Sequence, residues 1–152
     1  MMMDKMDWCL ATYFKESEAW GVPANMSKRL IWLLNNIRGV LPNNCWIKVH
    51  KGYSNNAGHS EKSQHYQIPC TAADFHVVGC SFLDAEAHII KYLHNSGMID
   101  YVGIGLYPQW VNPGFHIDVR GVRASWSKLN GDYVAYKLGF EYARKTFIKG
   151  DN

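Results

Sequence analysis

Four short segments of strand character constrain the fold of this chain most strongly. Each is rich in β-branched or aromatic residues and is bounded by Gly, Pro or Asn, which is typical of short strands. The segments cover residues 45–49, 73–78, 102–107 and 115–119. Helical patterns precede, interrupt and follow them, so the order of elements predicts an α+β fold with a small, mostly antiparallel sheet packed with helices.

The helical patterns fall in three parts of the chain. In the N-terminal part, over residues 8–38, we predict a short helix at 8–20 and a second helix that begins after Asn25 or Ser27. A third helix is predicted at 82–94, with Gly97 just beyond its end, and a last one at 133–147. Because 152 residues are about the length of one domain, we expect a single domain over residues 1–152, with its motif-bearing core at about 46–126.

Composition and charge exclude several classes of protein. A hydrophobic fraction of 47% with only 19% charged residues is typical of a folded globular chain. The net charge is +3, and like charges do not gather in blocks, so the sequence gives no indication of nucleic acid binding. The composition therefore favours a binding or catalytic site of another kind.

Neither a membrane span nor a leader is predicted. The longest uninterrupted apolar run, from Leu30 to Leu34, is far shorter than the roughly 20 residues of a transmembrane helix. Asp4, Lys5 and Asp7 stand where a signal peptide needs an apolar stretch. We expect synthesis in the cytoplasm without a signal peptide.

The four cysteines give no metal or redox motif. Cys9, Cys45, Cys70 and Cys80 contain no C-x-x-C pair, so neither a zinc ribbon nor a redox dithiol is indicated. We expect free, buried thiols. Disulfides stay open as an alternative if the protein functions outside the cytoplasm.

The segment 115–119 carries the first candidate site residues. Side chains alternate along a strand, so His116 and Asp118 leave one face while Phe115, Ile117 and Val119 fill the other. The apolar face suits the core, and the ionisable face suits a polar site.

A second candidate segment lies upstream. The polar, aperiodic stretch 52–64 is typical of a surface loop, and it leads to His65, which precedes Asp74 at the start of a strand. Zinc accepts His nitrogen and Asp oxygen ligands, so His65, Asp74 and His116 together would form a catalytic zinc site with three protein ligands. From spacing alone, hydrogen-bonded structural or surface histidines are the alternative.

Three ordered groups of residues carry a family resemblance. They are Ser63-Gln64-His65 with Ala72-Ala73-Asp74-Phe75, then Gly103-Ile104-Gly105-Leu106-Tyr107-Pro108, then Phe115-His116-Ile117-Asp118-Val119-Arg120-Gly121 with Arg123-Ala124-Ser125-Trp126. They resemble the zinc D-alanyl-D-alanine carboxypeptidase family, small bacterial and phage peptidases that share their fold with the hedgehog signalling domain. The resemblance implies that fold, one Zn²⁺ ion, and His65, Asp74 and His116 as its ligands.

The sequence departs from the family pattern at two functional positions. Gly52-Tyr53-Ser54 is similar to the family's Gly-Tyr-Arg segment, with Ser54 in place of an Arg that is thought to help anchor the substrate. Lys51, Arg120 or Arg123 are the candidates to replace that Arg. Many members also place a catalytic carboxylate three residues before the last His, where this chain has Pro113.

The resemblance implies a zinc-dependent peptidase that hydrolyses peptide stems or cross-links of bacterial peptidoglycan, of the D-Ala-D-Ala carboxypeptidase or L-Ala-D-Glu endopeptidase type. Asp118 is our predicted catalytic carboxylate, with the alternative that it orients a metal ligand. Ser63 and Tyr53 are predicted to contact the substrate. The competing hypotheses are a weakly active or inactive peptidoglycan-binding module of the same fold, and an interaction protein without metal.

A cell-wall substrate and the lack of a signal peptide together predict a phage or prophage lytic enzyme, an endolysin, that reaches the wall after holin-type release. Bacterial peptidoglycan is the expected partner. We expect a monomer.

Overall fold

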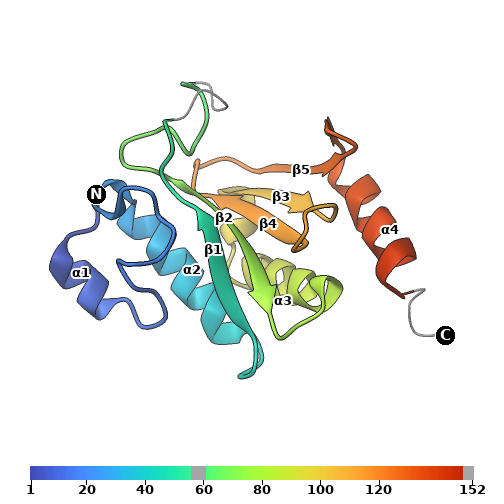
Figure 1. Ribbon diagram of the computed structural model, residues 1–152, viewed down its shortest axis with the longest axis horizontal. Coiled ribbons are helices and arrows are strands. Elements are labelled where there is room, and N and C mark those ends of the chain that lie inside the picture. Colours follow the sequence, from blue (N-terminus) through green and yellow to red (C-terminus); the bar gives the residue numbers. More distant parts are fainter. Residues whose placement is uncertain (56–60, 149–152) are drawn as a thin grey trace.

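The computed structural model describes residues 1–55 and 61–148. These residues form one α+β domain in which a six-stranded sheet packs with helices (Figure 1). The elements, in chain order, are α1 (Lys5–Leu10), α2 (Lys28–Val40), β1 (Trp46–Lys51), β2 (Ala72–Val78), α3 (Phe82–Asn95), β3 (Gly103–Tyr107), β4 (Gly114–Asp118), β5 (Ala124–Leu129), β6 (Asp132–Val134) and α4 (Tyr136–Phe147). Among the described residues, no helix is long and apolar enough to cross a membrane.

The sheet has the strand order β1-β2-β4-β3-β5-β6. Every neighbouring pair is antiparallel except β3 and β5, which are parallel. The sheet is therefore mixed, and the prediction of a mostly antiparallel sheet is confirmed.

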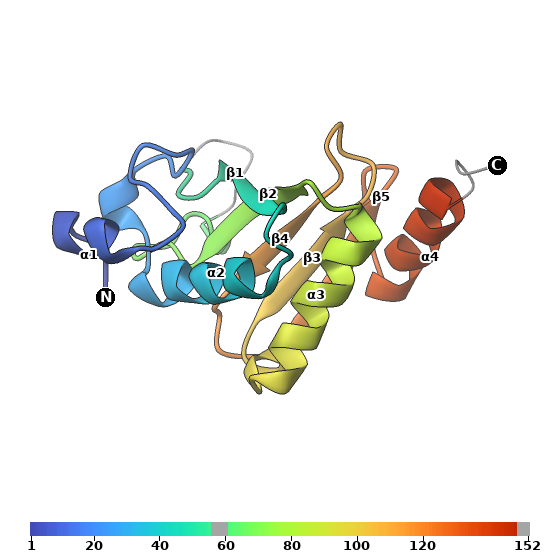
Figure 2. The same cartoon turned by 90° about the horizontal axis from the view of Figure 1, so that it is seen from below.

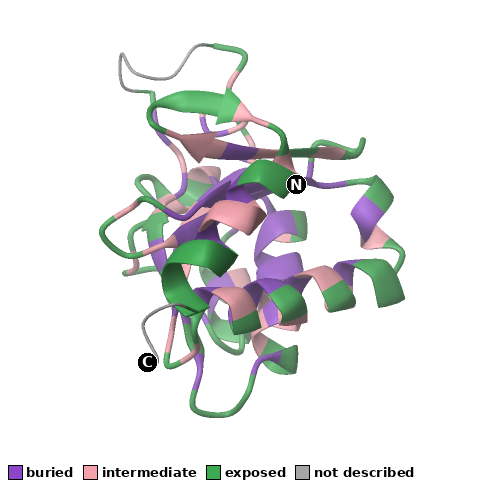
Figure 3. Cartoon of the chain, turned by 90° about the vertical axis from the view of Figure 1, so that its right-hand side faces the viewer, coloured by how far each residue is buried: buried purple, intermediate pink, exposed green. Residues whose placement is uncertain are grey.

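The two faces of the sheet have different chemistry. Alternate residues of the central strands, such as Phe75, Ile104 and Phe115, are buried in the hydrophobic core together with apolar residues of α2 and α3. Figure 2 shows α2 and α3 lying along the same face of the sheet. In Figure 3 the buried strand segments lie at the centre of the molecule, and exposed helical turns lie outside. The opposite face of the sheet carries the polar residues that form the candidate site.

The N-terminal helix is shorter than predicted. It covers Lys5–Leu10 because Asp4 and Asp7 close a capping box at its start, and residues 11–22 are irregular. In a helix over 8–20, Trp8, Phe14 and Trp20 would point about 120° apart around the axis, so one core could not bury all three. The irregular chain places the ring centroids of Trp8 and Phe14 at 5.4 and 5.6 Å, respectively, from that of Trp20. The helices α2 and α3 are confirmed, including Gly97 with a positive φ of 72° after the end of α3.

The C-terminal helix also differs from its prediction at 133–147. Residues 132–134 form the edge strand β6, and α4 begins at Tyr136. Asn130 and Gly131, with φ of 53° and 86°, make the two-residue connection between β5 and β6. Because Asn-Gly favours this kind of hairpin turn, the chain continues the sheet before it enters the helix.

One pair of cysteines corrects the prediction of free thiols. Cys45 and Cys80 form a disulfide that joins the start of β1 to the connection between β2 and α3. Cys9 and Cys70 are free, the first exposed and the second buried. No pattern in the sequence indicates this pairing, because the two cysteines become neighbours only when β1 pairs with β2.

Candidate metal centre

Four strands place one row of site residues across the polar face of the sheet. In the strand register, Asp74 on β2 pairs with His116 on β4, His116 pairs with Gly105 on β3, and Gly105 pairs with Trp126 on β5. Paired residues of neighbouring strands project from the same face. The sheet therefore aligns an aspartate, a histidine and an indole that are far apart in sequence.

Glycines in β3 leave space for this row. A Cβ at Gly105 would lie 2.6 Å from Trp126 Nε1, so a side chain there would collide with the indole. The Trp126 ring lies 5.1 Å from the His116 ring, and its Nε1–H donates to the Tyr107 hydroxyl at 3.2 Å. Gly103 has the same function under Asp118, whose Oδ2 would lie 2.5 Å from an added Cβ.

His65 reaches the row from the segment before β2. Its Nδ1–H donates to the Gly52 carbonyl at 2.7 Å, and its backbone N–H donates to Ser63 Oγ at 3.3 Å. The backbone N–H of Ser54 donates to the His65 carbonyl at 3.0 Å. The residues that follow β1 thus hold both the ring and the backbone of His65, which is 3% exposed.

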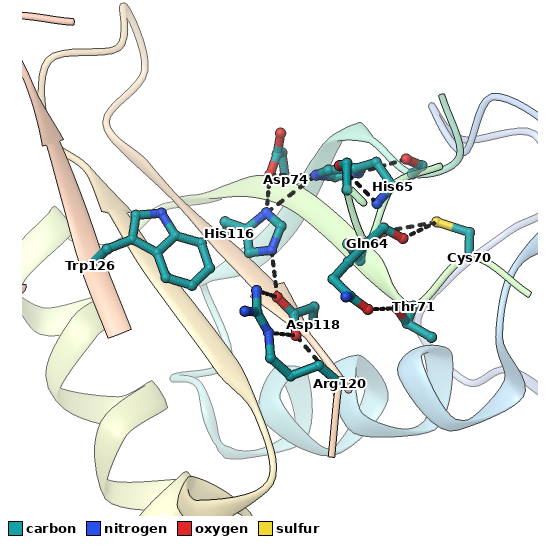
Figure 4. A network of polar contacts seen from close by, with 12 residues as sticks. Gln64, His65, Cys70, Thr71, Asp74, His116, Asp118, Arg120 and Trp126 are labelled. Atoms are coloured by element: carbon teal, nitrogen blue, oxygen red, sulfur yellow. Dashed lines mark hydrogen bonds and ion pairs between the residues drawn. The ribbon is translucent and has the colours of Figure 1, made fainter. Parts of the chain in front are cut away.

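His65, Asp74 and His116 meet at one point (Figure 4). His65 Nε2 lies 3.2 Å from Asp74 Oδ1 and 3.2 Å from His116 Nδ1, and His116 Nδ1 lies 2.8 Å from Asp74 Oδ1. Ligand atoms about 2.0–2.2 Å from one tetrahedral zinc ion are roughly 3.3–3.6 Å apart. Two of the three separations are close to this value, and the third is shorter.

The hydrogen bonds on the far side of each ring fix which nitrogen is available. A carbonyl only accepts, so Gly52 keeps a proton on His65 Nδ1 and leaves the Nε2 lone pair facing the meeting point. The Asp118 carboxylate accepts from His116 Nε2 at 2.9 Å and leaves the Nδ1 lone pair facing it as well. Two imidazole lone pairs and a carboxylate oxygen, all acceptors, therefore converge, and this donor set fits a zinc ion.

The electrostatics of the cluster favour a cation. Burial lowers the pKa of His116, but the hydrogen bonds and charges of Asp118 and Asp74 outweigh it and raise that pKa. Burial opposes ionisation of Asp74, yet hydrogen bonds with His116 and His65 hold its pKa well below its usual range. The cluster therefore attracts positive charge, whether a proton or a metal ion.

Asp118 lies behind His116, away from the meeting point. It is fully buried, and its carboxylate accepts from Arg120 Nε at 2.7 Å and Arg120 Nη2 at 2.6 Å as well as from His116. Burial opposes its ionisation, but Arg120 and His116 keep the pKa of Asp118 well below its usual range. It is therefore a carboxylate with both oxygens engaged (Figure 4).

The meeting point lies in a cavity of about 590 Å³. The described residues that line it are Lys62, Ser63, Gln64, His65, Asp74, Tyr107, Trp110, His116, Arg120, Trp126, Lys128 and Tyr133. Ser63 is thus placed at the cavity, as a residue that contacts a substrate must be. Tyr53 is not among these lining residues, and its ring packs against the hydrophobic core.

The candidates to replace the family Arg have different positions. Arg120 lines the cavity but donates to Asp118. Lys51 and Arg123 are not among the described residues that line this cavity. The Arg123 Nη1 atom lies 3.7 Å from Asp100 Oδ1 in an exposed ion pair. The Ser54 side chain is buried, and its Oγ has no hydrogen-bond partner among the described residues.

Three features of the site were not predicted. The packing of Trp126 over Gly105, the cavity position of Lys62 and the cavity position of Lys128 follow from the strand register and the loop conformation. Trp126 and Lys128 are two residues apart, and this spacing is a weak sequence signal that could have placed their side chains on the same strand face.

Comparisons with known proteins add no identification. No family model, no curated protein and no solved structure matches this chain.

Proposed function

We propose that this protein is a zinc-dependent peptidase that hydrolyses peptide stems or cross-links of bacterial peptidoglycan, as a phage or prophage lytic enzyme of hedgehog/DD-peptidase-like fold. The observation that carries the metal part is the convergence of His65 Nε2, Asp74 Oδ1 and His116 Nδ1 in a cavity of about 590 Å³. The reaction and the substrate rest on the resemblance of the motif segments.

In this proposal each residue has a defined role. A bound zinc ion supplies a Lewis acid and a water whose pKa is near 7. His65, Asp74 and His116 hold the ion. Asp118 accepts a hydrogen bond from the Nε2–H of His116 and fixes the ring, so it is a positioning residue. This geometry favours the positioning role over direct acid–base catalysis. The aromatic walls formed by Trp110 and Trp126 restrict how a peptide enters.

A second candidate function is supported by one specific observation. Asp74 is the only carboxylate among the described residues that line the cavity, and Pro113 occupies the position of the family's usual carboxylate. Peptide hydrolysis at a zinc site normally uses a second carboxylate to move the proton of the water. The same fold without hydrolysis would be a zinc-dependent module that binds peptidoglycan.

Zinc content and product analysis separate the hypotheses. Purified protein is analysed for bound metal and incubated with purified peptidoglycan, and the soluble products are identified by mass spectrometry. We expect bound zinc and released peptides or D-Ala from the natural protein. His116→Ala should lose both, whereas the control His94→Ala, an exposed position on α3, should retain both.

Each other result has a definite meaning. Bound zinc without any product supports the binding module and rejects the peptidase. Lack of bound zinc in the natural protein, after dialysis against a zinc-containing buffer, rejects both. Asp74→Asn keeps the shape of the side chain while it removes the charge, so this variant tests the site if His116→Ala fails to fold.

A further inference from the structure

The lining of the cavity is cationic. Lys62, Arg120 and Lys128 line it together with a single carboxylate among the described residues, Asp74, which faces two imidazoles. A ligand that fills the cavity therefore meets more positive than negative charge, and a negatively charged group is favoured there.

Lys128 is well placed to bind such a group. The guanidinium of Arg120 donates two hydrogen bonds to Asp118, and the negative charge of this carboxylate locally neutralises the positive charge of Arg120. Lys128 makes no ion pair with a carboxylate among the described residues. Its Nζ lies 5.0 Å from the centre of the Tyr133 ring, a contact that holds an ammonium group in place without cancelling its charge.

The strand register sets the distance between Lys128 and the metal centre. Lys128 follows Trp126 by two positions on β5, so both side chains project from the face of the sheet that carries the cavity. Trp126 lies in the same row across the strands as His116. Two strand spacings and two residues of rise separate the Cα atoms of His116 and Lys128 by about 12 Å. The Lys128 ammonium lies against Tyr133 on β6, on the opposite side of β5 from His116, so this span leaves room for about two or three extended peptide residues.

Lys128 also lines a second, adjoining cavity of about 200 Å³ with Tyr107, Gln109, Trp110 and Gly131. The Gln109 side chain fixes this side by two hydrogen bonds to Asn130, at 3.0 and 2.6 Å. Lys128 therefore stands where the two cavities meet, on a wall that the hairpin turn and Gln109 hold together.

We propose that Lys128 determines specificity by binding a free carboxylate of a peptide substrate, about two or three residues from the bond held at the metal centre. This inference rests on the proposed function for the identity of the peptide. In a stem peptide the carboxylate has two sources, the C-terminus and the α-carboxylate of D-Glu. A charge-assisted hydrogen bond from the Lys128 ammonium favours a peptide with the free carboxylate over one in which that carboxylate is amidated.

The test uses three synthetic stem pentapeptides and the zinc-loaded full chain. One peptide carries both free carboxylates, one has its C-terminus amidated, and one has the D-Glu α-carboxylate amidated. Binding is measured by the change in intrinsic tryptophan fluorescence, to which Trp110 and Trp126 at the cavity contribute. Hydrolysis is measured in parallel by mass spectrometry. The binding readout does not depend on turnover, so a protein without peptidase activity still tests Lys128.

For the natural protein we expect one of the two amidations to weaken binding by about tenfold. Lys128→Met should bind all three peptides equally, at the weaker level, and Lys128→Arg should restore the preference. Lys137→Met, an exposed lysine on α4, is the matched control and should behave as the natural protein. The proposal is overturned if neither amidation matters, if no peptide binds, or if Lys128→Met keeps the preference while its zinc content is normal.

Discussion

At the scale of single residues, Asp118 shows how a buried carboxylate can serve a site that it does not enter. Its two oxygens accept from His116 and from the backbone N–H, Nε and Nη2 of Arg120, and it is fully buried. A carboxylate that orients a histidine ligand typically contributes a factor of about 10–100 to metal affinity or activity. A carboxylate that moves protons would instead affect the rate alone.

We expect Asp118→Asn to weaken zinc binding by about 10–100-fold, because the neutral amide no longer favours the Nε2 proton of His116. Competition with a chromogenic chelator measures the affinity. Asp100→Asn, at an exposed position near Arg123, should leave the affinity unchanged. Unaltered zinc affinity of Asp118→Asn together with lost hydrolysis would contradict the positioning role and support direct catalysis.

The cluster of His65, Asp74 and His116 that could hold a metal ion could be predicted from sequence, but the partners of these residues could not. Strand alternation places His116 on a polar face, and the motif segments select His65 and Asp74 from the other His and Asp residues. The engagement of Asp118 with Arg120 depends on how residues 119 and 120 leave β4, and alternation does not encode that. Tyr53 shows the same limit, since an aromatic residue beside a motif also fits the core.

At the scale of elements, a hydrogen bond between two side chains links α3 and α4. The Tyr136 hydroxyl donates to Glu86 Oε1 at 2.6 Å, and Glu86 is buried on α3. Burial raises the pKa of Glu86 above its ordinary value of 4.5, although the bond from Tyr136 partly opposes that rise. The folded state therefore holds the Glu86 proton more tightly than the unfolded state.

This raised pKa predicts a pH dependence of stability. Well below pH 4.5 the Glu86 carboxyl is protonated in both the folded and the unfolded state, so its burial does not lower the free energy of unfolding through ionisation. As the pH rises from there through the folded-state pKa, the unfolded state ionises first, so the free energy of unfolding falls. Glu86→Gln, which keeps an acceptor for Tyr136, should remove that fall. Urea unfolding at pH 4 and pH 7 measures this fall. Glu141→Gln, at a half-exposed position on α4, is the control, and equal pH dependence in both variants would refute the prediction.

Strands were predictable where their residues carry β-branched and aromatic side chains, and not elsewhere. β1 to β4 lie close to their predicted positions. β5 has the sequence Ala-Ser-Trp-Ser-Lys-Leu, which has little strand propensity, and it is held by pairing with β3 and by contact of Ser127 with α4. Tertiary contacts of this kind override local preference.

At the scale of the whole molecule, the Cys45–Cys80 bond adds to the stability of the fold. It closes a loop with a sequence separation of 35, which contains β1, the segment of His65 and β2. Restricting a loop of this length in the unfolded chain contributes about 2–4 kcal/mol.

We therefore expect Cys45→Ala/Cys80→Ala to lower the free energy of unfolding by about 2–4 kcal/mol. Denaturant unfolding under non-reducing conditions measures the difference. The exposed, free Cys9 provides the control, since Cys9→Ala should change stability by less than about 0.5 kcal/mol. If the double variant unfolds with the same free energy as Cys9→Ala, the bond does not form in the folded protein.

The same bond makes a covalent ring of residues 45–80, and His65 and Asp74 belong to that ring while His116 lies outside it. A protease that cuts the chain once within the ring therefore opens it without separating any piece. The nicked protein migrates as one band on a non-reducing gel and as two after reduction. His65, Asp74 and His116 thus stay in one covalently linked molecule, because the disulfide joins the two fragments after the backbone has been cut.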